Sequence, residues 1–119
     1  MSQRRRSAHA RASSPETGLC PVDAALAVIG GRWKGSILWR LSVEGPMRPG
    51  ALRRRIPGVS EGVLLRQLAE LVDDGILERL DAGQLPLRVT YGLTAYGASL
   101  GPVMTELCRW GAAHSARPR

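Results

Sequence analysis

Two short segments with apolar residues at helical spacing flank a proline–glycine pair at positions 57–58. The first segment spans residues 49–56, and the second begins at Ser60, a residue type that favours helix N-caps. The second ends at residues 73–75, where Asp-Asp-Gly favours a helix stop. The residues expected to face inward are Ala51, Leu52, Ile56, Leu64, Leu68, Leu71 and Val72. The pattern therefore predicts a helix, a tight turn and a second helix.

Helical periodicity also precedes this unit. Residues 21–29 begin with a proline, which suits the first turn of a helix, and two glycines follow them. Residues 32–43 repeat apolar side chains at spacings of three and four until a glycine–proline pair stops them. The residues that carry the two patterns are Val22, Leu26, Ile29, Trp33, Ile37, Leu38 and Leu41. We expect two helices before the turn.

The pattern changes after residue 75. Residues 76–80 and 87–93 alternate apolar and polar side chains, and the intervening residues 81–86 contain a glycine and a proline, which predicts a hairpin. Residues 94–114 return to helical spacing, and Pro102 predicts a break just before it. The predicted fold is mainly α with a small β-hairpin (α+β): a winged helix-turn-helix in which the hairpin is the wing.

Length and composition allow one compact domain. The chain has 119 residues, 44% of them apolar and none Phe, so its core must be largely aliphatic. We predict a disordered basic arm at 1–18, the winged helix-turn-helix domain at 19–114 and a flexible basic tail at 115–119. The formal net charge is +7, and the two ends carry most of the excess. Cationic chains attract nucleic acid or anionic membranes, so charge alone does not identify the partner.

Several classes of function lack a sequence signal. No apolar run approaches the roughly 20 residues that cross a bilayer, and the arginine-rich start lacks the apolar stretch of a secretory signal, so we expect no membrane partner. Cys20 and Cys108 are far apart, and neither His9 nor His114 has a paired ligand nearby, so we expect no metal and no cofactor. No catalytic grouping is visible, and we expect a reduced, cytoplasmic protein without enzyme activity.

The predicted order of elements presents the N-terminal half of the Ser60 helix, and a helix presented in this way fits the major groove of DNA. The residues of this helix that the core does not use are Ser60, Glu61, Gly62, Val63, Leu65, Arg66 and Gln67. Arg66 can donate two hydrogen bonds to guanine, Gln67 can bind adenine, and Leu65 can meet a thymine methyl group. The alternative is that these are solvated helix residues, and helix capping alone is a sufficient role for Ser60.

Arginines flank this helix in the sequence. Arg53, Arg54 and Arg55 come before the turn, where the first helix of such a unit crosses the phosphates, so we expect at least one of them to contact the DNA backbone. Arg88, in the predicted hairpin, has the same choice between a phosphate and solvent. The acidic residues expected to face away from DNA are Glu70, Asp73, Asp74, Glu78 and Asp81.

The last predicted helix has more apolar residues than a helix covering a small domain requires, which predicts a homodimer interface. These residues are Leu100, Val103, Met104, Leu107 and Trp110. Packing within one chain is the alternative for some of them.

Cys20 precedes a helix N-terminus, where the peptide dipoles favour thiolate, and we expect Arg32 and Lys34 to add positive potential. Cys20 is thus either a redox sensor or structural, whereas we expect Cys108 to pack in the core or an interface.

The sequence resembles the HxlR-type winged-helix regulators over about residues 19–113. The residues that carry the resemblance are Cys20-Pro21-Val22, Ile29 to Lys34, Ile37-Leu38, Ile56 to Ser60, Leu64, Leu68, Leu71, Asp74 to Arg79, Pro86, Val89, Tyr91, Leu93-Thr94, Gly97, Leu100 and Trp110-Gly111. The resemblance implies cytoplasmic homodimers that bind inverted-repeat operators, usually as repressors. It implies that the first and last helices pack between subunits, which adds Val22 and Leu26 to the expected interface. Some such regulators sense electrophiles or oxidants through the cysteine matching Cys20, and others answer small-molecule effectors.

Three positions depart from the usual pattern of these regulators. Gly62 replaces a basic or larger residue, Leu65 replaces a small hydroxyl residue, and Thr90 stands where an acid is common. The base preference is therefore open. A winged-helix module that binds proteins and makes no specific DNA contact is the alternative function.

Overall fold

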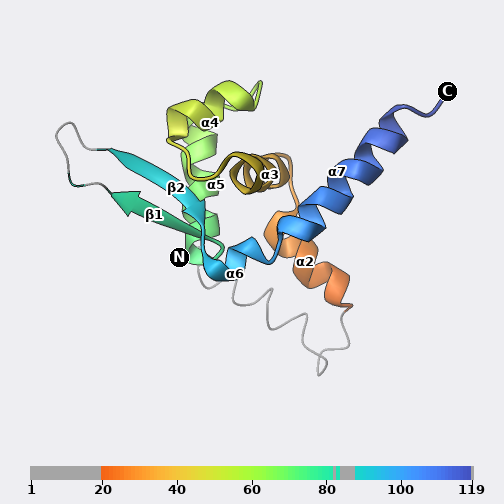
Figure 1. Cartoon of the computed structure of the whole chain (residues 1–119), viewed down its shortest axis with the longest axis horizontal. Helices are drawn as coiled ribbons and strands as arrows, with labels where there is room; N and C mark the ends of the chain where they lie inside the picture. Colours follow the sequence, from red (N-terminus) through yellow and green to blue (C-terminus); the bar gives the residue numbers. More distant parts are fainter. Residues whose placement is uncertain (1–19, 82, 84–87, 119) are drawn as a thin grey trace.

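The computed structural model describes residues 20–81, 83 and 88–118. The predicted basic arm at 1–18 and the tip of the predicted hairpin at 84–87 lie outside the described residues. The described helices are α2 (Pro21–Ile29), α3 (Lys34–Glu44), α4 (Pro49–Arg55), α5 (Glu61–Asp73), α6 (Ala95–Ala98) and α7 (Gly101–Ser115). The strands are β1 (Leu77–Asp81) and β2 (Val89–Leu93). This order confirms the prediction of a mainly helical fold with one hairpin (Figure 1).

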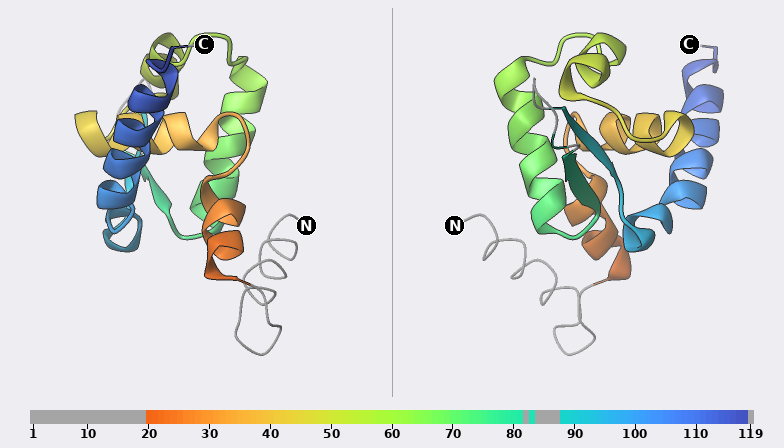
Figure 2. Two further views of the ribbon diagram at one scale, coloured as in Figure 1. Left: turned by 90° about the vertical axis from the view of Figure 1, so that its right-hand side faces the viewer. Right: turned by 60° about the vertical axis from the view of Figure 1, so that its left-hand side comes forward.

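The core is aliphatic, as the composition predicts. Helix α3 runs through the middle of the molecule and contacts α2, α4, α7 and β2. The largest fully buried side chains are Ile37, Leu38, Leu52, Leu64, Leu68, Leu71 and Leu77. They come from α3, α4, α5 and β1, so the helix-turn-helix unit and the hairpin share one core. Figure 2 shows α5 running alongside the hairpin from two further directions.

The turn between α4 and α5 forms as the sequence predicts. Gly58 has a φ of +92°, a left-handed conformation that glycine adopts without strain. The Ser60 hydroxyl oxygen accepts a hydrogen bond from the Val63 amide at 3.2 Å, which confirms its N-cap role. From α3, the Trp33 ring packs against the turn: its Cη2 would lie 3.5 Å from a Cβ at position 58.

A buried ion pair joins α3 to α5. Lys34 Nζ lies 2.7 Å from Glu70 Oε1, and the two side chains are 10% and 16% exposed. A charge that is shielded from water raises the free energy of the folded state when it has no partner. The pair therefore favours the arrangement in which α3 and α5 lie close enough for the two side chains to meet. Lys34 and Glu70 are far apart in the sequence, so no local pattern predicts this pair.

The hairpin strands begin one or two residues later than predicted. The antiparallel register pairs Leu77 with Leu93 and Asp81 with Val89. Ile76, expected in the first strand, is buried, and its carbonyl accepts the Thr94 amide at 3.0 Å. This bond lies at the next position of the same register, with residue 76 opposite residue 94, so the predicted start of the first strand differs from the observed one by a single residue.

The C-terminal helical region breaks where the proline predicts. Helix α6 ends at Ala98, and Pro102 lies in the first turn of α7, where its missing N–H costs nothing. At the start of α6, the Thr94 side chain accepts the Gly97 amide at 2.9 Å and donates to the Gly75 carbonyl at 2.7 Å. No helix in the described ranges is long and apolar enough to cross a membrane.

Gly97 provides a test of this junction. A Cβ at position 97 would lie 2.0 Å from the Ile76 carbonyl oxygen, a backbone atom that cannot move aside cheaply. We expect Gly97→Ala to lower the free energy of unfolding by about 1–3 kcal/mol, measured by urea denaturation followed by circular dichroism. Gly62→Ala is the control, because a Cβ there meets nothing within 4 Å. Equal stability of Gly97→Ala and the natural sequence would contradict the packing described.

Candidate nucleic-acid interface

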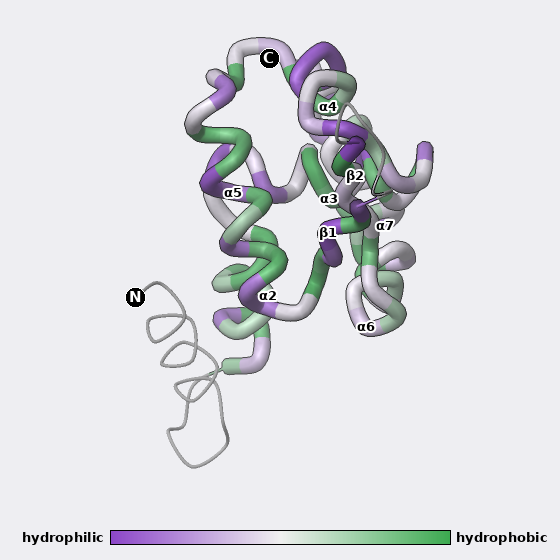
Figure 3. Tube along the Cα trace, turned by 90° about the vertical axis from the view of Figure 1, so that its left-hand side faces the viewer, coloured by the Kyte–Doolittle hydropathy of each residue, from purple (hydrophilic) through white to green (hydrophobic). Residues whose placement is uncertain are grey.

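The N-terminal half of α5 presents a side that the core does not use. Figure 3 shows hydrophobic and hydrophilic stretches alternating along this helix, as expected when one face is buried. Glu61, Gly62 and Arg66 are exposed, and Leu65 is 42% exposed despite being apolar. Because helix residues four apart lie above one another, Gly62 and Arg66 form one row on this side. A Cβ at Gly62 would meet nothing within 4 Å, so the row leaves room for close approach to Arg66.

Two predicted contact residues are less available than expected. Val63 is half-buried and packs against the core, so it supports the helix more than it faces outward. Gln67 is also half-buried. Of the predicted contact residues at this helix, five are therefore exposed: Ser60, Glu61, Gly62, Leu65 and Arg66.

The three consecutive arginines of α4 have three different surroundings. Arg53 Nε donates to the Val59 carbonyl at 3.4 Å, within the turn. Arg55 Nε donates to Glu44 Oε1 at 2.7 Å, and the other oxygen of Glu44 accepts from Arg40 at 3.3 Å. Arg54 instead lines a surface depression beside the hairpin. The structure thus separates residues that look equivalent in the sequence.

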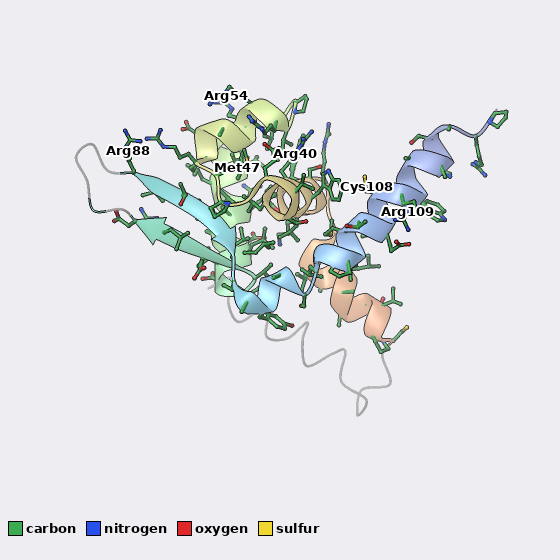
Figure 4. All side chains as sticks on the ribbon, viewed as in Figure 1. Arg40, Met47, Arg54, Arg88, Cys108 and Arg109 are labelled. Carbon is green, nitrogen blue, oxygen red and sulfur yellow. The ribbon has the colours of Figure 1, made fainter. Side chains whose placement is uncertain are left out.

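Arg88 is exposed and lies just before β2. Figure 4 shows Arg54 and Arg88 on the same side of the molecule, at α4 and at the hairpin. Arg48, which the sequence analysis did not single out, lines the depression together with Arg54. A single arginine before a proline is part of no periodic pattern. Only its position directly before a predicted helix could have marked it as a candidate for DNA contact.

Exposed apolar residues lie on α2 and on α7, two helices that are away from the hairpin in Figure 1. They are Val22 at 59% exposure, Leu26 at 54%, Val103 at 42%, Leu107 at 47% and Trp110 at 67%.

Two further predicted interface residues belong at least partly to the chain's own core. Met104 is 5% exposed and part of that core, and Leu100 is half-buried against it. Met104 therefore serves packing within one chain, which was the alternative left open for some of these residues.

Cys20 is exposed and occupies the N-cap position of α2, directly before Pro21. The expectation that Arg32 and Lys34 add positive potential there is wrong. They follow the opposite end of this nine-residue helix, which is about 13 Å long. Lys34 pairs with Glu70, and the Arg32 guanidinium stacks over the Trp33 ring at 4.6 Å.

Cys108 is exposed on α7, so core packing within the chain, one of the two roles expected for it, does not occur. It lines a depression of about 350 Å³ between α3 and α7, together with Trp39 and Met104. An interface role remains for this thiol.

Comparison with known proteins identifies the family. The sequence matches the HxlR-like helix-turn-helix family over residues 28–118. It is 42% identical over 93 residues to the uncharacterised HTH-type transcriptional regulator YdzF of Bacillus subtilis (strain 168), covering 78% of this chain and 85% of that protein.

Two solved structures have the same fold. The crystal structure of ytcD, an HTH-type transcriptional regulator, has a TM-score of 0.75 at 42% identity and covers 81% of this chain and 97% of that one. The redox regulator HypR in its oxidised form has a TM-score of 0.73 at 40% identity and covers 84% of this chain and 100% of that one. The chain with the exposed Ser60 helix and its adjoining hairpin therefore belongs to the HxlR-like helix-turn-helix family of transcriptional regulators.

Proposed function

We propose that this protein is a cytoplasmic regulator that binds an inverted-repeat operator in double-stranded DNA and represses transcription. The observation that carries the proposal is the exposed row of Gly62 and Arg66 on a helix whose other face is buried. Arg66 donates to a guanine edge in the major groove, and the missing side chain at position 62 lets the helix approach the bases. The exposed Leu65 contacts a thymine methyl group.

The regulator acts as a homodimer. One module of this size buries little DNA surface, so two modules on half-sites about one helical turn apart provide useful affinity and match an inverted repeat. The exposed apolar residues of α2 and α7 support this assembly, since side chains such as Trp110 would lose contact with water at an interface.

Arg66→Ala tests the DNA-facing helix. We expect binding to a duplex selected from a random library to weaken by about 1–3 kcal/mol, with relaxed preference at one base pair of each half-site. Fluorescence anisotropy with the selected duplex and its single-base variants measures both effects. Arg109→Ala is the matched control, because it removes the same charge from an exposed site on α7, where Arg109 pairs with Glu106. Unchanged affinity and preference in Arg66→Ala would show that the helix is assigned wrongly.

We propose further that the Cys20 thiol senses oxidants or electrophiles. It is exposed at a helix N-terminus, where the aligned peptide dipoles favour the reactive thiolate. The similarity to HypR, described as a redox regulator, supports this class of signal. A small-molecule effector is the alternative signal.

Cys20→Ser tests the sensor. Diamide should release the natural protein from its operator duplex, because it oxidises two thiols to a disulfide while it is itself reduced to a hydrazine, and the serine variant should stay bound because position 20 then has no thiol to contribute. The measurement is the dissociation constant before and after diamide, and Cys108→Ser shows whether the second sulfur comes from Cys108 or from Cys20 of the other protomer. Equal release of the natural protein and Cys20→Ser would remove Cys20 as the sensor, and resistance of the natural protein itself would favour a small-molecule effector.

A further inference from the structure

A shallow depression lies where the start of α4 meets the hairpin. It has a volume of about 390 Å³ and is lined by Arg48, Pro49, Gly50, Ala51, Arg54 and Val89. Two of these lining residues are arginines and none is acidic. Val89 is the first residue of β2, so the wall of the depression is shared between the helix-turn-helix unit and the hairpin.

Both arginines keep their charge available. Arg48 and Arg54 are exposed, and none of the ion pairs in the described part of the chain includes either of them. Arg54 Nη1 would lie 3.9 Å from a Cβ at Gly50, so its side chain turns back over the first turn of α4. By contrast, Arg55, which lies on α4 next to Arg54, forms an ion pair with Glu44 of α3. The depression is thus a positively charged hollow without a carboxylate of its own among the lining residues.

We propose that this hollow, the Arg48–Arg54 cradle, holds one phosphate group of the DNA backbone between its two guanidinium groups. The inference rests on the proposed DNA binding and adds Arg48 to its contact residues. Guanidinium groups match the geometry of phosphate oxygens and bind them by charge-assisted hydrogen bonds. A DNA phosphate is exposed along the backbone, so an open depression suits it better than it suits a ligand that must be enclosed.

The position of the Arg48–Arg54 cradle allows it to orient the protein on DNA as well as to attract the phosphate backbone. Its walls include residues of α4 and β2, and Arg88 lies at the hairpin on the same side of the molecule as Arg54 (Figure 4). A phosphate held there touches the first helix of the unit and the hairpin together. Backbone contacts of this kind position a protein on any duplex and carry no sequence information themselves, so the cradle holds α4 and the hairpin on the backbone while the bases are read elsewhere.

Salt dependence of DNA binding tests whether the two arginines share one phosphate. We expect Arg48→Ala and Arg54→Ala each to lower the slope of log affinity against log salt by about 0.9 per bound protomer. Affinity falls about fivefold to tenfold per protomer near 0.1 M salt. The double variant loses little more than either single variant, because the phosphate is held between the two guanidinium groups and one of them alone does not retain it. The ratio of affinities for the operator and an unrelated duplex stays unchanged, because phosphate contacts carry no sequence information.

Gly50→Asp separates phosphate binding from stability. An acidic residue in the first turn of α4 stabilises the helix, and the new Cβ meets only the mobile end of Arg54. We expect the urea midpoint to hold or rise while DNA affinity falls about tenfold or more, since the carboxylate occupies the cradle. Arg109→Ala, on α7 and outside the hollow, is the control and should bind DNA as the natural protein does.

Three outcomes overturn the cradle. Additive slope losses in the double variant would place the two arginines on separate phosphates. Unchanged slopes in Arg48→Ala and Arg54→Ala would show that neither contacts DNA, and full affinity in Gly50→Asp would show that the hollow is empty in the complex. If the natural protein itself binds no duplex in a salt-dependent way, the proposed function fails instead.

Discussion

The ion pair between Lys34 and Glu70 links α5, the helix that carries Arg66, to α3. Lys34 Nζ and Glu70 Oε1 are 2.7 Å apart, and both side chains are largely shielded from water. The aliphatic contacts that surround the pair are not directional and tolerate small shifts between helices. A buried charge tolerates little, because separation from its partner leaves it uncompensated. We infer that this pair sets the position of α5 on α3, and with it the direction in which Arg66 faces.

Trp33 extends the same support to the turn before α5. Its ring packs against Gly58, and the guanidinium of Arg32 lies over the ring at 4.6 Å. These residues and Lys34 follow directly after the glycines that end α2, so the junction between α2 and α3 holds both the turn and the helix. Because Cys20 occupies the N-cap position of α2, we infer that this junction is a physical route from the proposed thiol signal to the exposed side of α5.

Local chemistry made most of the elements predictable from the sequence. Apolar spacing located the helices, Ser60 marked the start of α5, and Pro102 marked the break before α7. The predicted start of β1 differs from the observed one by a single residue, Ile76, whose carbonyl accepts the Thr94 amide at the next position of the same register. Periodicity also does not distinguish an apolar helix face that packs within its own chain from one that packs against another chain. Met104 is buried within the chain, whereas Leu107, one turn later, is 47% exposed.

The partners of charged side chains were the least predictable part of the site, because they depend on tertiary distances. Glu44 lies eleven residues before Arg55 in the chain and yet forms an ion pair with it, which no spacing in the sequence indicates. Arg48 looked unremarkable in the sequence and lies in the hollow beside Arg54. A net charge of +7 therefore says little about where DNA binds. The fold defines the surface by neutralising some arginines with its own carboxylates and leaving others without an ion pair beside α4, α5 and the hairpin.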